Sequence, residues 1–171
     1  MKTLWTIGHS TRDLEEFLYL LKTFEIELLV DVRHYPGSRK FPQYNKENMV
    51  TSLPQNDLEY KHIVELGGRR KVQTNSKNDA WRLASFRGYA DYMETKEFET
   101  ALKQLKALAI KKRTAIMCAE AVWWSCHRSM ISDALKVENW TVLHIMNDKT
   151  TTEHPFTTPA KVVHGRLDYS K

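Results

Sequence analysis

The chain has 171 residues, of which 42% are hydrophobic and 27% are charged, a composition typical of an ordinary water-soluble globular domain. No apolar run approaches the roughly 20 residues of a membrane-spanning helix, so we expect no membrane partner. The N-terminus lacks the long apolar core of a secretion signal and leads directly into a strand-like run. We therefore expect a cytoplasmic protein whose 2 cysteines are reduced thiols, metal ligands or catalytic groups.

The charge balance is mildly basic, with 26 Lys and Arg against 21 Asp and Glu and a net charge of +5. Such a charge favours anionic partners, either nucleic acid or a phosphorylated small molecule; the alternative is that it serves only solubility. The forked guanidinium of arginine suits phosphate oxygens, and aromatic rings can stack on nucleic-acid bases. The alternative is that the arginines pair with acidic side chains and the aromatic rings fill the core. The arginines expected in loops or at helix starts are Arg33, Arg39, Arg69, Arg70, Arg82, Arg87 and Arg128, and the interleaved rings are Trp81, Phe86, Tyr89, Trp123 and Trp124.

The first part of the chain alternates strand and helix patterns. Residues 4–7 predict a short strand, and residues 14–21 predict an amphipathic helix because apolar side chains recur at helical spacing. Ser10 followed by Asp13 fits a capping box for that helix. Residues 26–32 contain the continuous apolar run Leu28-Leu29-Val30, which is typical of a strand covered on both faces.

The middle of the chain predicts a short helix over residues 45–52, which Pro54 ends, and a third strand over residues 58–63. The polar residues 71–85 predict a mobile loop or lid. A long helix is expected over residues 86–112. Its apolar side chains at helical spacing are interpreted as core rather than as a cofactor site. They are Tyr89, Met93, Phe98, Leu102, Leu105 and Ala109.

Residues 114–118 and 141–146 predict two further buried strands, with a helix over residues 129–137 between them, and residues 160–169 predict a small hairpin tail. This alternation predicts a single α/β domain over residues 1–171, a Rossmann-like three-layer sandwich with a mostly parallel central sheet. Right-handed crossovers place the carboxyl ends of parallel strands at one edge, where ligands bind. The strand exits with reactive side chains are residues 8–11, 31–33, 67–69 and 118–128.

Cys126 is the strongest single candidate for chemistry. It precedes a predicted helix start and has His127 and Arg128 beside it, and these features lower the pKa of a thiol and favour the reactive thiolate. The alternative is that Cys126 is a buried, inert cysteine. For Cys118, at the end of an apolar strand, a functional role and an inert, buried one are equally favoured. A phosphatase-type C-x5-R loop is excluded, since no arginine follows either cysteine at that spacing, and there is no C-x-x-C redox pair.

A metal site is a further alternative for the same segment. Cys118, Cys126 and His127, joined by His9 or His62 from other strand ends, form a mixed sulfur and nitrogen set of a kind that binds zinc or iron. The C-x7-C-H spacing matches no standard structural zinc pattern, and the sequence contains no nucleotide-cofactor motif. The sequence thus identifies no cofactor, and zinc and iron are the metals to test.

Two acids and one histidine at the same edge are candidates for proton transfer. Glu120 follows a strand end and is a candidate general acid or base. Asp31 is an equal candidate, because an acid at the end of a buried strand usually has a partner or a role; a salt bridge with Arg33 or the capping of a loop is the alternative. His9 could cap the turn, bind a ligand or transfer a proton.

Motifs that occur in order along the chain support a family resemblance. They are Thr6-Ile7-Gly8-His9-Ser10, Asp31-Val32-Arg33 with Pro36 and Ser38, Leu66-Gly67-Gly68-Arg69, Phe86-Arg87-Gly88-Tyr89-Ala90 with Tyr92 and Met93, and Met117-Cys118-Ala119-Glu120 with Cys126-His127-Arg128. The chain resembles the bacterial and archaeal family named Domain of Unknown Function 488, over essentially its whole length. The resemblance implies a compact cytosolic α/β protein. It implies no established reaction, so no catalytic role is carried over from it.

The residues together predict an enzyme that acts on a phosphate-bearing substrate, a nucleotide or a nucleic-acid component, at the carboxyl edge of the sheet. A non-enzymatic nucleic-acid-binding or regulatory module is the alternative, and a thiol-dependent or metal-dependent sensor is a further one. The expected catalytic residues are Cys126, Glu120, His9 and Asp31, and the expected substrate-binding residues are Ser10, Arg33, Arg69, Arg128 and Tyr89.

Overall fold

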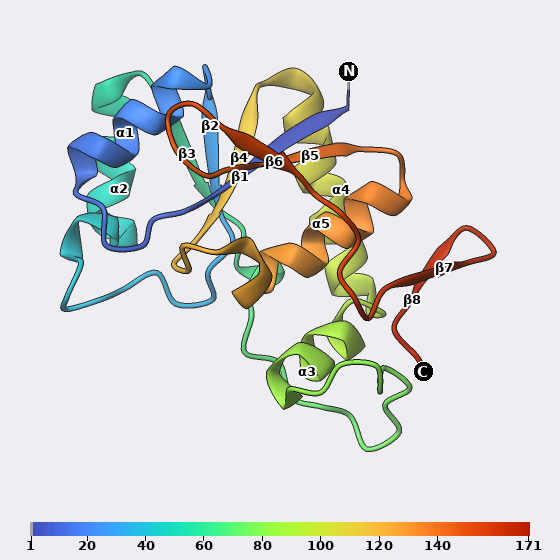
Figure 1. Cartoon of the computed structure of the whole chain (residues 1–171). Helices are drawn as coiled ribbons and strands as arrows, with labels where there is room; N and C mark the ends of the chain where they lie inside the picture. Colours follow the sequence, from blue (N-terminus) through green and yellow to red (C-terminus); the bar gives the residue numbers. More distant parts are fainter. Residues whose placement is uncertain (1) are drawn as a thin grey trace.

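The computed structural model describes residues 2–171 and confirms the predicted three-layer α/β fold (Figure 1). The central sheet has six strands in the order β3-β2-β4-β1-β5-β6. All neighbouring strands are parallel except β6, which runs antiparallel to β5. The strands are β1 (Thr3–Gly8), β2 (Leu28–Asp31), β3 (Glu59–His62), β4 (Thr114–Cys118), β5 (Thr141–Ile145) and β6 (Thr151–Glu153). The carboxyl ends of β1, β2, β3 and β4 therefore meet at one edge.

The helices cover both faces of this sheet, with α1 and α2 on one side and α4 and α5 on the other (Figure 1). Side chains of β1 alternate between the two cores: Leu4 packs in the cluster that contains Leu105 of α4, and Ile7 packs in the cluster that contains Phe17 of α1. The helices are α1 (Leu14–Thr23), α2 (Lys46–Ser52), α3 (Ala84–Tyr92), α4 (Lys96–Lys111) and α5 (Arg128–Val137). Short 3-10 turns are η1 (Pro42–Tyr44), η2 (Pro54–Asn56), η3 (Val64–Leu66) and η4 (Trp123–Ser125).

Two details of the predicted helices are wrong: the residue that caps the first helix, and the continuity of the long helix. Asp13, not Ser10, caps α1: its carboxylate accepts the backbone N–H of Glu16 at 2.8 Å. The long helix expected over residues 86–112 is two helices, because Thr95 has an extended backbone and its hydroxyl caps α4 by accepting the N–H of Phe98. The core positions expected along these helices are buried, apart from the partly exposed Met93.

The end of the chain matches the prediction in part. The expected tail hairpin is confirmed as β7 (Lys161–Val163) paired antiparallel with β8 (Arg166–Asp168). The sequence did not predict β6, since its side chains are polar and at least partly exposed and show no apolar alternation. None of the helices formed by residues 2–171 is long and apolar enough to cross a membrane.

The polar segment before α3 is irregular, as predicted, and it is tied to that helix through Asp91. The Asp91 carboxylate accepts hydrogen bonds from the backbone N–H of Gln73 at 2.8 Å, the hydroxyl of Ser76 at 2.6 Å and the amide of Asn78 at 2.7 Å. These contacts fix the path of the loop beside α3, whose first turn lines the candidate site described below.

A chain of buried polar side chains crosses the α5 side of the sheet. The Asp133 carboxylate accepts from Nε2 of His154 at 2.8 Å, so Nδ1 of His154 is an acceptor for Nε2–H of His144 at 2.9 Å. Nδ1 of His144 in turn accepts from the hydroxyl of Thr6 at 2.5 Å. Every ring nitrogen of the two histidines thus has a hydrogen-bond partner, and burial together with His154 lowers the pKa of His144 to about 2.

This depressed pKa predicts a loss of stability in mild acid. The unfolded chain protonates His144 below its ordinary pKa of 6.5, whereas the folded protein does not, so the free energy of unfolding falls by about 1.4 kcal/mol per pH unit below that value. Urea unfolding at about pH 7 and about pH 5 should show this term, of about 2 kcal/mol, in the parent and not in His144→Gln. The same pH dependence in both proteins would contradict the assignment.

Candidate active site

A cavity of about 380 Å³ opens at the carboxyl edge of the sheet, the edge where open α/β folds bind ligands. Its walls come from the exit of β2, the loop after β3, the first turns of α3 and the segment between β4 and α5. The lining residues with functional side chains outside the predicted set are His34, Tyr35, Ser85, Phe86, Cys118, Ser125 and His127. The cavity thus combines a thiol pair, imidazoles and aromatic rings.

The cavity brings together part of the predicted site. The predicted residues that line it are Cys126, Glu120, Arg33, Arg69 and Tyr89. The predicted residues that do not line it are His9, Asp31, Ser10 and Arg128. Of these, all but Ser10 are buried, so any effect they have on a ligand is transmitted through a neighbouring side chain.

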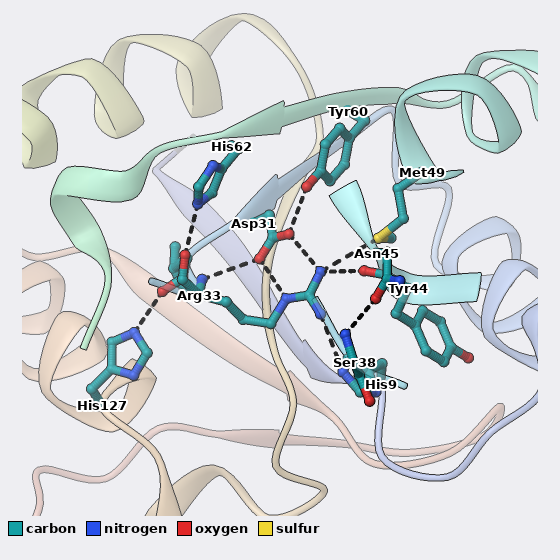
Figure 2. Close-up of polar contacts among 11 residues, drawn as sticks. His9, Asp31, Arg33, Ser38, Tyr44, Asn45, Met49, Tyr60, His62 and His127 are labelled. Carbon is teal, nitrogen blue, oxygen red and sulfur yellow. Dashed lines mark hydrogen bonds and ion pairs between the residues drawn. The ribbon is translucent and has the colours of Figure 1, made fainter. Parts of the chain in front are cut away.

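Cys126 and His127 form a thiol–imidazole pair at the start of α5. Nε2 of His127 donates to the carbonyl oxygen of Val32 at 2.7 Å (Figure 2), which fixes the tautomer and leaves Nδ1 as an acceptor. That nitrogen lies 3.6 Å from Sγ of Cys126, so the thiol donates to it. Burial lowers the pKa of His127, and its imidazole is consequently neutral and able to accept the thiol proton.

Cys118 lies beside Cys126, and the two thiols have opposite properties. Both thiols line the cavity and pack in the same buried cluster, and the sulfur of Cys118 lies 3.8 Å from the carbonyl oxygen of Glu120. Burial raises the pKa of Cys118 well above its ordinary value. Burial also acts to raise the pKa of Cys126, but the Cys118 thiol and the charge and backbone N–H of Arg128 outweigh it and lower that pKa. Of the two thiols, Cys126 is therefore the one that loses its proton more readily.

Arg128 is a buried cation, and no carboxylate among residues 2–171 pairs with it. It is 1% exposed, Nη2 donates to the carbonyl oxygen of Ala121 at 3.2 Å, and Nε and Nη1 have no hydrogen-bond partner. A buried guanidinium is costly unless an anion lies nearby, and Cys126 supplies a negative charge once its thiol loses the proton, which the charge of Arg128 favours. Gly8 permits the arrangement, because a Cβ there would lie 1.7 Å from the Glu120 carbonyl oxygen and 3.0 Å from Nη1 of Arg128.

The Asp31 carboxylate is fully buried and is held by its neighbours (Figure 2). It accepts hydrogen bonds from Nε and Nη2 of Arg33 at 2.9 and 2.7 Å and from the hydroxyl of Tyr60 at 2.6 Å. Nη2 of Arg33 also donates to the carbonyl oxygen of Tyr44 at 2.5 Å. The structure shows both contacts expected in the alternative interpretation of Asp31: the salt bridge with Arg33, and a loop cap in which the carboxylate accepts the backbone N–H of Arg33 at 3.1 Å.

His9 supports the other side of the Arg33 guanidinium. Its ring stacks on Tyr44 with 4.3 Å between centroids, and its Nδ1 donates to the carbonyl oxygen of Ser10 at 2.9 Å. Nε2 is consequently an acceptor, and it faces Nη1 of Arg33 at 3.5 Å. Burial lowers the pKa of His9, so its neutral ring positions Arg33.

The family model described as Domain of unknown function DUF488 matches residues 13–135 of the 171-residue chain. That stretch begins at the cap of α1 and contains the whole segment from Cys118 to Arg128. The chain belongs to the DUF488 family. The comparison with curated proteins and the comparison with solved structures each found no match.

The cavity of this DUF488 protein also contains residues that sequence reasoning missed. His34 and Tyr35 follow Arg33 at the exit of β2, a position that could have marked them, and Ser85 comes from the first turn of α3. His34 donates through Nδ1 to the carbonyl oxygen of Gly68 at 2.9 Å. A Cβ on Gly68 would lie 3.2 Å from Nδ1 of His127, so the glycine keeps the base of the thiol pair accessible.

The residues proposed for a metal do not fit one in this arrangement. Residues 2–171 contain no group of three His, Cys, Asp or Glu side chains placed to hold a metal ion. His127 uses Nε2 on the Val32 carbonyl oxygen, and His62 uses Nε2 on the Arg33 carbonyl oxygen at 2.7 Å. His9 faces Arg33 instead of the thiols.

Proposed function

We propose that this DUF488 protein is an enzyme that acts on a phosphate-bearing substrate, a nucleotide or a nucleic-acid component, with Cys126 as its nucleophile. The observation that carries this proposal is the Cys126 thiol, 3.6 Å from the acceptor nitrogen of His127, in a cavity that Arg69 also lines. A thiolate with a neighbouring base and an anion-binding arginine is an arrangement suited to group transfer.

The proposed reaction begins with transfer of the Cys126 proton to Nδ1 of His127. The thiolate attacks the phosphorus atom of the substrate, a sulfur–phosphorus bond forms, and the bond to the leaving oxygen breaks. The leaving oxygen takes the proton back from His127. A water molecule then attacks phosphorus, gives its proton to Glu120 at the cavity wall, and releases the Cys126 thiolate.

The three arginines at the site have different roles in the proposed reaction. Arg69 is exposed, and its guanidinium lies 5.3 Å from the centroid of the Tyr35 ring, which leaves its N–H groups available for phosphate oxygens. Arg33 donates to the Asp31 carboxylate through Nε and Nη2, so only the part of its side chain that lines the cavity can contact a substrate. Arg128 acts on the substrate through the Cys126 thiolate, because its side chain is buried.

A non-enzymatic nucleic-acid-binding module is the second candidate function, and the Tyr35 side chain favours it. That ring is 66% exposed beside Arg69 at the cavity wall, an arrangement on which a base can stack. Binding without turnover, with affinity that falls steeply as salt rises, would select this alternative. We also propose a cytoplasmic location, since both cysteines are free thiols.

Replacing Arg69 tests the anion site directly. Arg69→Ala should weaken the binding of inorganic phosphate and of mononucleotides by about tenfold or more, since a charge-assisted hydrogen bond contributes about 1.5–3 kcal/mol. Arg166→Ala, at an exposed arginine of the tail hairpin, is the matched control and should bind as the parent does. Isothermal titration at two salt concentrations measures both. Equal affinity in Arg69→Ala and the parent would contradict the proposal that Arg69 binds the phosphate of the substrate.

A further inference from the structure

Both cysteines of the chain meet in the cavity wall, although seven residues separate them. Cys118 ends β4 and Cys126 lies two residues before α5; both line the cavity and pack in the same buried cluster, close enough that each thiol shifts the pKa of the other. Both are free thiols. The proposed group-transfer reaction uses Cys126 alone, so the second thiol at this position is unexplained by it.

We propose that Cys118 and Cys126 form a reversible intramolecular disulfide when the protein meets a small hydroperoxide, with Cys126 oxidised first and Cys118 closing the bond. The proposal rests on the reactive Cys126 of the proposed function but not on its substrate. It makes this pair a modification site that switches the nucleophile off.

The chemistry balances with a hydroperoxide as the oxidant. The Cys126 thiolate attacks the outer peroxide oxygen, the oxygen–oxygen bond breaks, and the released alkoxide or hydroxide takes a proton from water. Cys126 is now a sulfenic acid. Cys118 attacks its sulfur, the sulfur–sulfur bond forms, and the hydroxide that leaves combines with the Cys118 proton as water. Two electrons pass from the two thiols to the peroxide.

The surroundings assign the order of the two steps. Arg128 is a buried cation whose Nε and Nη1 have no hydrogen-bond partner among residues 2–171, and its charge favours loss of the Cys126 proton. Cys118 stays protonated in its buried position. A thiolate reacts with peroxide and a protonated thiol does not. Cys126 is therefore oxidised first, and Cys118 then closes the disulfide.

Peroxide titration with mass spectrometry tests the pair. At about one equivalent of hydrogen peroxide, the parent should lose both alkylatable thiols together, lose the mass of two hydrogen atoms and regain both thiols with dithiothreitol. Cys118→Ser should stop at a sulfenic acid on Cys126 that a dimedone probe captures. Cys126→Ser should keep its remaining thiol at the same peroxide concentration.

Other results would overturn the inference. Oxidation of Cys126 to sulfinic acid while Cys118 stays alkylatable, disulfides between chains, or two unreacted thiols in the parent would each contradict it. These measurements need no substrate, so they separate the two proposals. A disulfide without any phosphate-dependent turnover would leave this inference standing and remove the proposed function; turnover without a disulfide would do the reverse. The parent measurement holds even if either serine variant folds poorly.

Discussion

Replacing Cys126 with serine is expected to reduce turnover of a phosphate-bearing substrate by at least about a thousandfold, the scale of loss when a nucleophile is removed. Serine is close in size, and its hydroxyl can still donate to Nδ1 of His127, which lies 3.6 Å from the present sulfur. A hydroxyl with an ordinary pKa is far less ionised than this thiol, so the attack fails while the cavity keeps its shape. Steady-state assays on a panel of nucleotides and phosphoesters measure the effect.

Two readouts show that such a loss is chemical and not structural. The urea midpoint of Cys126→Ser should stay close to that of the parent, and its affinity for inorganic phosphate should be unchanged, because Arg69 is untouched. If Cys126→Ser turns over substrate at the parent rate, the covalent route through this sulfur is excluded.

Asp31→Leu is expected to cause the largest loss of stability, about 3–5 kcal/mol in the free energy of unfolding. The carboxylate is fully buried and accepts three side-chain hydrogen bonds from Arg33 and Tyr60. Leucine leaves the Arg33 guanidinium charged and largely buried without its counter-ion, which is more costly than losing the pair together. Urea unfolding followed by circular dichroism measures the difference.

The double variant Asp31→Leu/Arg33→Met isolates that cause. Removing both charges should recover most of the lost stability, because no unpaired ion remains in the core. Asp148→Leu is the matched control at an exposed aspartate and should change stability by about 0.5 kcal/mol or less. Additive losses in the double variant would contradict the ion-pair account.

The fold was predictable because its strands are continuous apolar runs and its helices have strong apolar periodicity. Residues 114–118 illustrate this: five consecutive buried side chains identify a central strand with the bounds that the structure has. The break at Thr95 was not predicted, since a threonine inside a helical pattern acts as a cap only when its backbone turns extended. The strand β6 depends on pairing with β5 and has no pattern of its own.

The candidate site was predictable in position more than in its contacts. The strand exits indicated the edge, and Cys126 beside His127 and Arg128 indicated the thiolate. The sequence could not show that Asp31 accepts two bonds from Arg33, since an acid two residues from an arginine has many possible partners. Nor could it show that His127 is fixed by the Val32 carbonyl oxygen, a contact between residues that lie far apart in the chain.

The pH dependence of alkylation at Cys126 tests the central claim most directly. Iodoacetamide reacts with thiolates, so its rate at each pH reports the pKa of the sulfur, and peptide mass spectrometry assigns the rate to Cys126 or Cys118. We expect a half-maximal rate at Cys126 below the ordinary thiol pKa of 9.0, with Cys118 unreactive over the same range. A half-maximal rate at Cys126 at or above that value, or faster reaction at Cys118, would contradict the assignment of Cys126 as the nucleophile.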